Sequence, residues 1–201
     1  MVSRLRCFIG GILFCFFTSS FALHATENDD LVKAMMEVYA EELAANPQDY
    51  RTYYSRAMAY FGQGDMKKAL SDIDNAIKYF PRKEKDDLAQ AYLLRAKILS
   101  ERGEAKSALT DLNSALRLVP NHRLALKDRG DLLCRLGQYD MAKIDYNHLL
   151  RMDTRSQSAF MGLARVEAHT GQPVRAKDLL AQAVNLSPKD PKIYLERSEI
   201  Y

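Results

Sequence analysis

Cysteine is scarce in this 201-residue chain, and its three residues fall in two regions. Cys7 and Cys15 lie in an apolar N-terminal stretch, and Cys134 stands alone in the rest of the chain. A single cysteine cannot form an internal disulfide, so none can hold the main part of the chain together. Cys134 shares a helical stripe with Leu126 and Leu133, which favours a buried thiol over a reactive one.

Glycine and proline are also few, with nine and six residues, and the formal net charge is only +3. With 47% apolar and 27% charged residues, the composition is ordinary for a soluble helical protein and does not indicate disorder. Removing Arg4 and Arg6 with an N-terminal leader would lower the charge to about +1. Such a balance gives no basic stripe, so nucleic acid is not expected as a partner.

Patterns for catalysis or metal binding are missing from the sequence. The four histidines, His24, His122, His148 and His169, stand at ligand spacing neither from one another nor from a cysteine, so no metal site is predicted. The sequence has no nucleophile paired with a base and no glycine-rich phosphate loop. We therefore expect a protein that is not an enzyme and that carries no cofactor.

The N-terminal residues have the composition of an export signal. Two arginines precede an apolar stretch at residues 7–17, and small residues follow it. We interpret residues 1–22 as a cleaved signal peptide, with cleavage after Ala25 as the alternative. The expected location is the periplasm or the secreted fraction. The apolar run is short for a membrane span, and a membrane becomes a partner only if the signal stays uncleaved as an anchor.

One block of residues recurs four times along the rest of the chain. The copies begin at Tyr53, Tyr92, Leu126 and Phe160. Each has a bulky residue, an Arg or Leu three places on, a small residue next, a Gly about seven further and an Ala five beyond that. The small residues Ala96, Gly130 and Ala164 lie 34 positions apart, whereas Ala57 and Ala96 are 39 apart. A fixed period of this size indicates one supersecondary unit stacked on copies of itself.

Each repeat is predicted to be two helices joined by a tight turn. In the first repeat, apolar residues fall at helical spacing before Gly64 and again after it. Glycine at this place can take the left-handed conformation that ends the first helix, and Asp65 and Pro173 suit the start of the second. Small residues let the two helices approach closely, so leucine there should cost about 1 to 3 kcal/mol. The turn glycines are Gly64, Gly103, Gly137 and Gly171, and the close-packing residues are Ala57, Ala96, Gly130, Ala164, Ala69, Ala108, Ala142 and Ala176.

This pattern resembles the tetratricopeptide repeat family, which places an aromatic residue, a Leu-Gly pair, a Tyr, an Ala, an aromatic residue and a Pro along about 34 residues. The resemblance covers residues 47–201, with Arg56, Arg95 and Arg129 in place of the usual Leu. Thr154 replaces the closing Pro of the third repeat. The resemblance implies an all-α protein, a right-handed α-solenoid of antiparallel helix pairs. The expected units are a capping helix at 27–46, repeats at 47–81, 88–120, 121–154 and 155–188, a charged connector at 82–87 and an incomplete fifth repeat at 189–201.

The connector and the two ends are expected to depart from the repeat. At the connector we predict one extra helical turn or a longer solvated loop. The fifth repeat stops within its first helix, which would leave Ile193, Tyr194 and Tyr201 bare unless the chain continues or something covers them. The apolar face predicted for the capping helix consists of Val32, Met35, Met36, Tyr39 and Leu43.

Three arginines are each followed sixteen residues later by an aspartate: Arg56 by Asp72, Arg95 by Asp111 and Arg129 by Asp145. In the fourth repeat Leu163 stands in the place of the Arg and Leu179 in that of the Asp. The joint replacement predicts that the two positions face each other across the helix pair. We interpret the pairs as structural, because replacing both partners of a buried ion pair by apolar residues can be neutral.

The resemblance also implies a concave surface, lined by the first helix of each repeat, that receives an extended peptide or a helix of a partner protein. The residues expected there are Tyr54, Met58, Phe61, Lys97, Glu101, Lys127, Asp131, Arg135, Met161, Arg165 and His169. The first end of this surface is apolar and the far end is charged. Lys97, Asp131, Arg165 and Glu199 alternate in sign at one repeat position, which predicts mutual neutralisation along the solenoid or recognition of a charged partner.

Some members of the family grip a carboxylate with a clamp of Lys, Asn and Arg. That clamp is missing here, because the matching places hold Tyr54, Met58, Leu94, Leu124 and Asp128. The leading interpretation is a non-catalytic exported scaffold that binds another protein through its concave groove. Two alternatives stay open: an N-terminal sensory or regulatory module of a longer protein, and self-association through the open C-terminal end.

Overall fold

The computed structural model describes residues 31–189 and 191–200, and the signal peptide predicted at residues 1–22 lies outside them. All regular structure in these residues is helical, which confirms the all-α prediction. A helix at residues 31–45 is followed by α2 (Tyr50–Gly62), α3 (Met66–Tyr79), α4 (Lys85–Glu101), α5 (Ala105–Leu118), α6 (Arg123–Arg135), α7 (Tyr139–Met152), α8 (Gln157–His169), α9 (Pro173–Leu186) and α10 (Pro191–Ile200).

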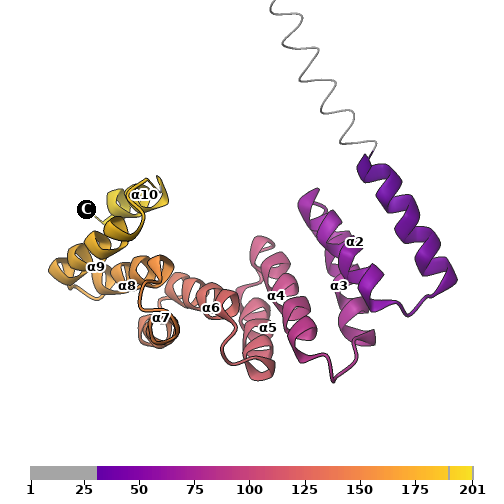
Figure 1. The fold of residues 1–201 in the computed structure, drawn as a ribbon, viewed down its shortest axis with the longest axis horizontal. Coiled ribbons are helices and arrows are strands. Elements are labelled where there is room, and N and C mark those ends of the chain that lie inside the picture. Colours follow the sequence, from indigo (N-terminus) through magenta and orange to yellow (C-terminus); the bar gives the residue numbers. More distant parts are fainter. Residues whose placement is uncertain (1–30, 190, 201) are drawn as a thin grey trace, which may run out of the picture.

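The helices pack in consecutive pairs, and each pair is one repeat: α2 with α3, α4 with α5, α6 with α7, and α8 with α9. The second helix of a repeat also packs on the first helix of the next, so the repeats form a continuous row. Figure 1 shows this row as an arc, with α4 and α6 toward its inner side and α5 and α7 toward its outer side. We call the surface formed by α2, α4, α6 and α8 the inner face.

A left-handed glycine ends the first helix of every repeat, as predicted. The φ angles are +79° at Gly64 and Gly103, +71° at Gly137 and +78° at Gly171. Residues with a side chain are strained at such angles, so these four positions favour glycine. The second helix of the first repeat, α3, then begins with a side-chain cap. The Asp65 carboxylate accepts a hydrogen bond from the Lys68 backbone N–H at 3.0 Å.

Tyr146 fills the core of the third repeat, at the place that Ile73, Leu112 and Leu180 hold in the others. Its side chain is fully buried between α6 and α8. A Cβ atom built on Gly130 would lie 2.9 Å from the Tyr146 ring, and one built on Gly162 would lie closer still. Both glycines are therefore required by the size of the tyrosine, which explains why glycine replaces the alanine of the other repeats at position 130.

Each predicted Arg-Asp pair is joined by two hydrogen bonds between the helices of its repeat. The Arg56 Nε lies 2.7 Å from Asp72 Oδ2, and the corresponding distances are 2.7 Å in the Arg95-Asp111 pair and 2.8 Å in the Arg129-Asp145 pair. The Nη2 atom of each arginine donates to the other carboxylate oxygen. In the fourth repeat, Leu163 belongs to an apolar core cluster, and the partly buried Leu179 packs against the same cluster.

Two of these arginines also reach into the preceding repeat, which the sequence pattern did not predict. Arg95 Nη1 donates to Asp74 of α3 at 2.7 Å, and Arg129 Nη1 donates to Asn113 of α5 at 2.8 Å. One guanidinium therefore holds its own helix pair together and fastens it to the repeat before it.

The longer spacing between the first two repeats is taken up mainly by helix. α4 has 17 residues, whereas α2, α6 and α8 have 13 each, a difference of about one turn. Of the predicted connector, residues 82–84 lie between helices. Lys85, Asp86 and Asp87 form the first turn of α4, where the two aspartates interact favourably with the positive end of the helix dipole.

The ends of the array differ from the predictions at two residues. On the helix at residues 31–45, Val32, Met36, Tyr39 and Leu43 are at least partly buried, but Met35 is exposed because it projects to the side of that face. At the other end Ile193 is fully buried, since α10 packs on both α8 and α9, while Tyr194 is exposed. The C-terminal helix is therefore less bare than the sequence predicted.

Candidate functional site

The inner face contains a pocket of about 280 Å³ between α4 and α6. α2 packs on α4 and α6 packs on α8, but α4 and α6 make no comparable contact, which leaves this space open. The pocket is lined by Phe61, Ala96, Lys97, Ser100, Glu101, Leu112, Asp128, Asp131, Leu132 and Arg135. Its volume is near the lower end of the range for ligand sites, about 300 to 1,000 Å³, and suits a side chain or two better than a large cofactor.

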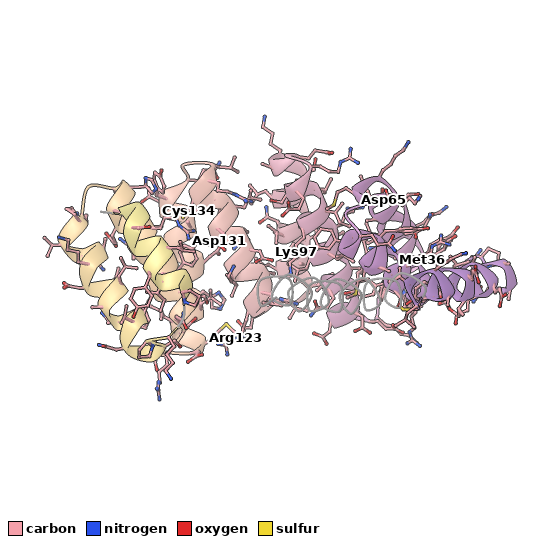
Figure 2. The ribbon with its side chains drawn as sticks, turned by 90° about the horizontal axis from the view of Figure 1, so that it is seen from above. Met36, Asp65, Lys97, Arg123, Asp131 and Cys134 are labelled. Carbon is pink, nitrogen blue, oxygen red and sulfur yellow. The ribbon has the colours of Figure 1, made fainter. Side chains whose placement is uncertain are left out.

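Five of the eleven residues predicted for the concave surface line this pocket, namely Phe61, Lys97, Glu101, Asp131 and Arg135. Figure 2, which looks down on the arc from above, places Lys97 and Asp131 in the middle of the molecule and Met36 toward one end. Lys127 lies beside the pocket on α6, and Tyr54 and Met58 lie on α2.

The three predicted residues on α8, namely Met161, Arg165 and His169, do not line the pocket. Arg165 pairs with Asp131 from across the repeat boundary. His169 stacks on Tyr139 of α7, with ring centroids 5.3 Å apart, and so joins two helices. Only a part of the predicted surface is therefore brought together in one site.

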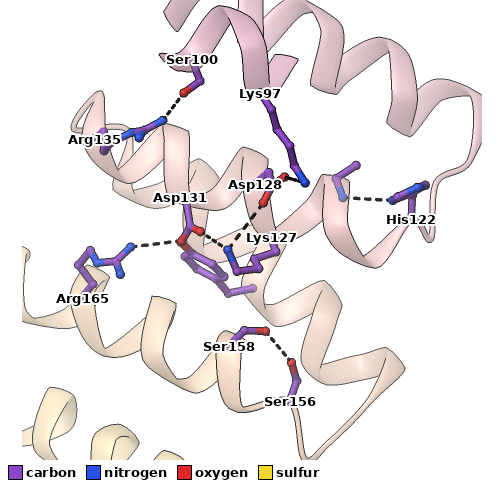
Figure 3. A network of polar contacts seen from close by, with 12 residues as sticks. Lys97, Ser100, His122, Lys127, Asp128, Asp131, Arg135, Ser156, Ser158 and Arg165 are labelled. Carbon is purple, nitrogen blue, oxygen red and sulfur yellow. Dashed lines mark hydrogen bonds and ion pairs between the residues drawn. The ribbon is translucent and has the colours of Figure 1, made fainter. Parts of the chain in front are cut away.

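Asp131 is held by donors from three helices (Figure 3). Its Oδ2 lies 2.7 Å from Lys127 Nζ, and its Oδ1 lies 3.2 Å from Arg165 Nη1. The Tyr146 hydroxyl, which reaches from α7, donates to the same Oδ1 at 2.7 Å. Burial raises the pKa of Asp131, but Lys127, Tyr146 and Arg165 together outweigh it and keep the pKa below its usual range. This carboxylate is ionised and fully engaged.

Tyr146 stays protonated in this arrangement. Burial raises the pKa of its hydroxyl far above the ordinary value, and the neighbouring Asp131 raises it further. The hydroxyl is therefore a permanent donor to Asp131, and the buried core of the third repeat fixes the position of a charged group on the inner face.

Asp128 contrasts with Asp131, because its contacts with the ammonium groups of the described residues are longer ion pairs. Its Oδ1 is 3.6 Å from Lys127 Nζ and its Oδ2 is 3.8 Å from Lys97 Nζ, both longer than a hydrogen bond. The Oδ2 atom is inaccessible to solvent, and no residue in the described part of the chain donates to it. A buried carboxylate oxygen without a donor is unfavourable, so the site has an unused capacity to accept a hydrogen bond.

The remaining charges on the pocket wall are arranged less regularly than the predicted alternation. Lys97 pairs with Asp128 and not with Asp131, and the side chain of Glu199 lies outside the described residues. Arg135 spans the gap between α4 and α6 by donating to Ser100 Oγ at 2.7 Å. Within residues 31–189 and 191–200, no cation pairs with Glu101.

An apolar stretch on α2 leads into the pocket. It consists of Tyr54, Met58 and Phe61, and the Met58 side chain is 51% exposed. Tyr54 is partly buried, which raises the pKa of its hydroxyl, and the nearby Asp87 raises it further. The inner face therefore combines exposed apolar area with an acceptor that lacks a donor.

Sequence reasoning missed five of the lining residues: Ala96, Ser100, Leu112, Asp128 and Leu132. Asp128 precedes Asp131 by three positions and so lies on the same side of α6, a signal that helical spacing already contained. Cys134 is buried, as predicted, with its sulfur 3.8 Å from the Tyr146 hydroxyl. Among the described residues, no group of His, Cys, Asp and Glu could hold a metal ion, and no helix has the length and apolar character to cross a membrane.

Comparisons with known proteins agree with this architecture. A model of the tetratricopeptide repeat family matches residues 37–87, 54–123 and 127–191. A tetratricopeptide repeat protein from Parabacteroides merdae has a similar structure, with a TM-score of 0.76 and 26% identity over 88% of this chain and 68% of that one. YrrB, described as a TPR protein with an unusual peptide-binding site, has a TM-score of 0.71 and 17% identity over 86% of each chain. MamA has a TM-score of 0.67 and 18% identity over 77% of this chain and 87% of its own. None of the curated proteins compared with the chain matches it.

Proposed function

The chain belongs to the tetratricopeptide repeat family, and from this premise we propose that it is a non-catalytic scaffold that binds an extended segment of another protein along its inner face. The observation that carries the proposal is the pocket between α4 and α6, with the apolar stretch of α2 beside it. Apolar side chains of a bound segment would cover the exposed part of α2, and polar groups would enter the pocket. The same fold carries a peptide-binding site in YrrB, which supports this proposal.

Export of the scaffold is a further part of the proposal, and it rests on the N-terminal sequence. Residues 1–22 have the basic, apolar and small-residue order of a secretion signal. Fractionation of cells that express the full chain tests it. We expect a shortened protein in the periplasm or the medium, and a full-length protein in the cytosol would contradict it.

A matched pair of substitutions tests the use of the inner face. Met58 on α2 and Ile144 on α7 are both exposed, at 51% and 63%, but Ile144 lies on a helix of the outer side of the arc. Binding is measured on an immobilised array of random decamer peptides. We expect Met58→Glu to abolish binding of the protein to this array, because the substitution puts a charge into the apolar stretch. Ile144→Glu should leave retention unchanged. Equal retention by the Met58→Glu variant and the unsubstituted protein would contradict the proposal.

The exposed apolar residues of α7 favour a second candidate, self-association through the outer side. Met141 and Ile144 are exposed there, whereas α9 has Arg175 and Asp178 at the corresponding positions. Sedimentation over a wide range of protein concentrations tests this candidate. A dimer that Ile144→Glu dissociates would support it, and a monomer at the highest concentration would exclude it.

A further inference from the structure

We propose that the pocket between α4 and α6 receives a lysine or arginine side chain of the bound segment, with Asp128 as the principal acceptor. This inference rests on the proposed function, because the side chain would belong to the segment that lies along the inner face. It adds the chemical class of residue that the pocket selects.

Asp128 has two long ion pairs, with Lys97 and Lys127, but its buried oxygen has no hydrogen-bond donor among the described residues. Asp131 has three donors between 2.7 and 3.2 Å, whereas both oxygens of Asp128 are more than 3.5 Å from the nearest ammonium groups. The Asp128 Oδ2 atom is buried and lacks a donor among the described residues. A cationic side chain that reached this oxygen would make a short, charge-assisted hydrogen bond where none exists.

The repeat itself does not require a carboxylate at this position. The residue two places after the bulky opener is Ser55 in the first repeat, Leu94 in the second and Gly162 in the fourth, and Asp128 in the third. These repeats fold into the same helix pair with three different neutral residues. The fold therefore does not require a charge at position 128, as expected of a residue that serves binding.

Lys97 can give way to an incoming cation. Its ammonium lies 3.8 Å from Asp128, and its side chain is 44% exposed. Glu101 follows it by one helical turn on α4, lines the same pocket and is available as a partner. When a ligand ammonium or guanidinium takes the place beside Asp128, Lys97 can turn to Glu101, so that no charge in the pocket is left without a partner.

The charge of the lining favours a cation over an anion. The lining carboxylates are Glu101, Asp128 and Asp131, and the lining cations are Lys97 and Arg135. An acidic side chain would bring its negative charge against the Asp128 oxygen, which already lacks a proton donor, and would be repelled. The apolar part of the wall, with Phe61, Leu112 and Leu132, suits the methylene stem of lysine or arginine. The Phe61 ring can also face the cationic head.

The test measures the residue preference of bound peptides and its dependence on Asp128. The unsubstituted protein is applied to an array of random decamers, and the best peptide is then titrated by fluorescence anisotropy. We expect enrichment of Lys or Arg at one peptide position. Asp128→Asn should weaken this peptide at least about tenfold. Asp178→Asn, which removes an exposed carboxylate from the outer helix α9, is the matched control and should not change the affinity.

A double-substitution cycle separates recognition from misfolding. Replacing the basic peptide residue by norleucine removes its charge and keeps its stem. If the pair exists, this change should weaken binding to the unsubstituted protein but not to the Asp128→Asn variant. The thermal midpoint of that variant should be no lower than that of the unsubstituted protein, because the lost carboxylate had no hydrogen-bond donor.

The outcomes distinguish this inference from the proposed function. The protein could bind peptides in which Lys and Arg are not enriched, or in which Asn, Gln or acidic residues are enriched instead. Either result would overturn the inference and leave the proposed function standing. Independent effects of Asp128→Asn and norleucine would overturn it as well. If the unsubstituted protein retains no peptide at all, both fail.

Discussion

Replacing Arg95 by leucine is expected to destabilise the protein more than replacing its partner Asp111 by leucine. Arg95 donates hydrogen bonds of 2.7 Å from both Nε and Nη2 to the Asp111 carboxylate, but the surroundings of the two residues differ. The Asp111 side chain is only 4% exposed, whereas that of Arg95 is 24% exposed. Arg95 also has a second carboxylate partner, Asp74, at 2.7 Å.

The expected magnitudes follow from these differences. Arg95→Leu leaves a buried carboxylate without any donor, which costs about 3 to 5 kcal/mol. Asp111→Leu leaves a guanidinium that water and Asp74 still reach, so its cost is about 1 to 3 kcal/mol. In the double variant the two leucines can pack as Leu163 and Leu179 do in the fourth repeat. Asp74, whose side chain is 53% exposed, is then hydrated, and the cost falls to about 0 to 1 kcal/mol.

Urea unfolding followed by far-ultraviolet circular dichroism measures the free energy of unfolding for the two single variants and the double variant. The losses in free energy of unfolding of the two single variants should sum to at least about 3 kcal/mol more than the loss in the double variant. Arg102→Leu is the control, because Arg102 pairs with Glu104 at the same 2.7 Å but at the surface, and it should cost less than about 1 kcal/mol. Additive costs for Arg95 and Asp111, or equal costs for the two single variants, would refute the reasoning.

Three further predictions follow from local geometry. Gly162→Ala should cost about 1 to 3 kcal/mol in calorimetry because its methyl group meets the Tyr146 ring, and a combined Tyr146→Leu should recover part of that loss; no recovery would contradict the contact. Gly137→Ala should cost about 1 to 2 kcal/mol because φ is +71°, whereas Gly62→Ala, with open space around it, should not destabilise; equal effects would count against the turn argument. Because Lys127, Tyr146 and Arg165 lower the pKa of Asp131 despite its burial, its ionised form stabilises the fold above the unfolded pKa of about 3.9, and this stability is lost as pH falls through the folded pKa. Carbon-13 NMR of the Asp131 carboxyl should show a midpoint below about 3.9, the ordinary value for an aspartate, and a higher midpoint would contradict the network.

The repeat pattern was sufficient to predict those features that recur in each copy. The four turn glycines and the partners of Arg56, Arg95 and Arg129 could be identified because a fixed period compares equivalent positions within a single chain. The exchange of Arg and Asp for Leu163 and Leu179 was especially informative, since it changed both sides of one contact together.

Contacts between repeats were harder to predict, because they depend on how each helix pair is rotated against the next. The hydrogen bond from Arg95 to Asp74 joins residues 21 positions apart in the sequence, and that from Arg129 to Asn113 joins residues 16 apart. Because the two spacings differ, no single sequence period predicts both bonds. The pocket depends on the separation of α4 and α6, and the need for Gly162 depends on the reach of Tyr146. Neither separation nor reach is encoded in a local pattern.

Site-specific photocrosslinking tests the central claim, the binding of a partner segment on the inner face, most directly. A benzoylphenylalanine residue is placed at Met58 on α2 in one variant and at Ile144 on α7 in another, since both positions are exposed. Each variant is irradiated with the tightest-binding decamer, and the crosslinked residues are identified by mass spectrometry. We predict crosslinks from position 58 and none from position 144. Crosslinks from position 144 alone would contradict the account and move the binding surface to the outer side of the arc.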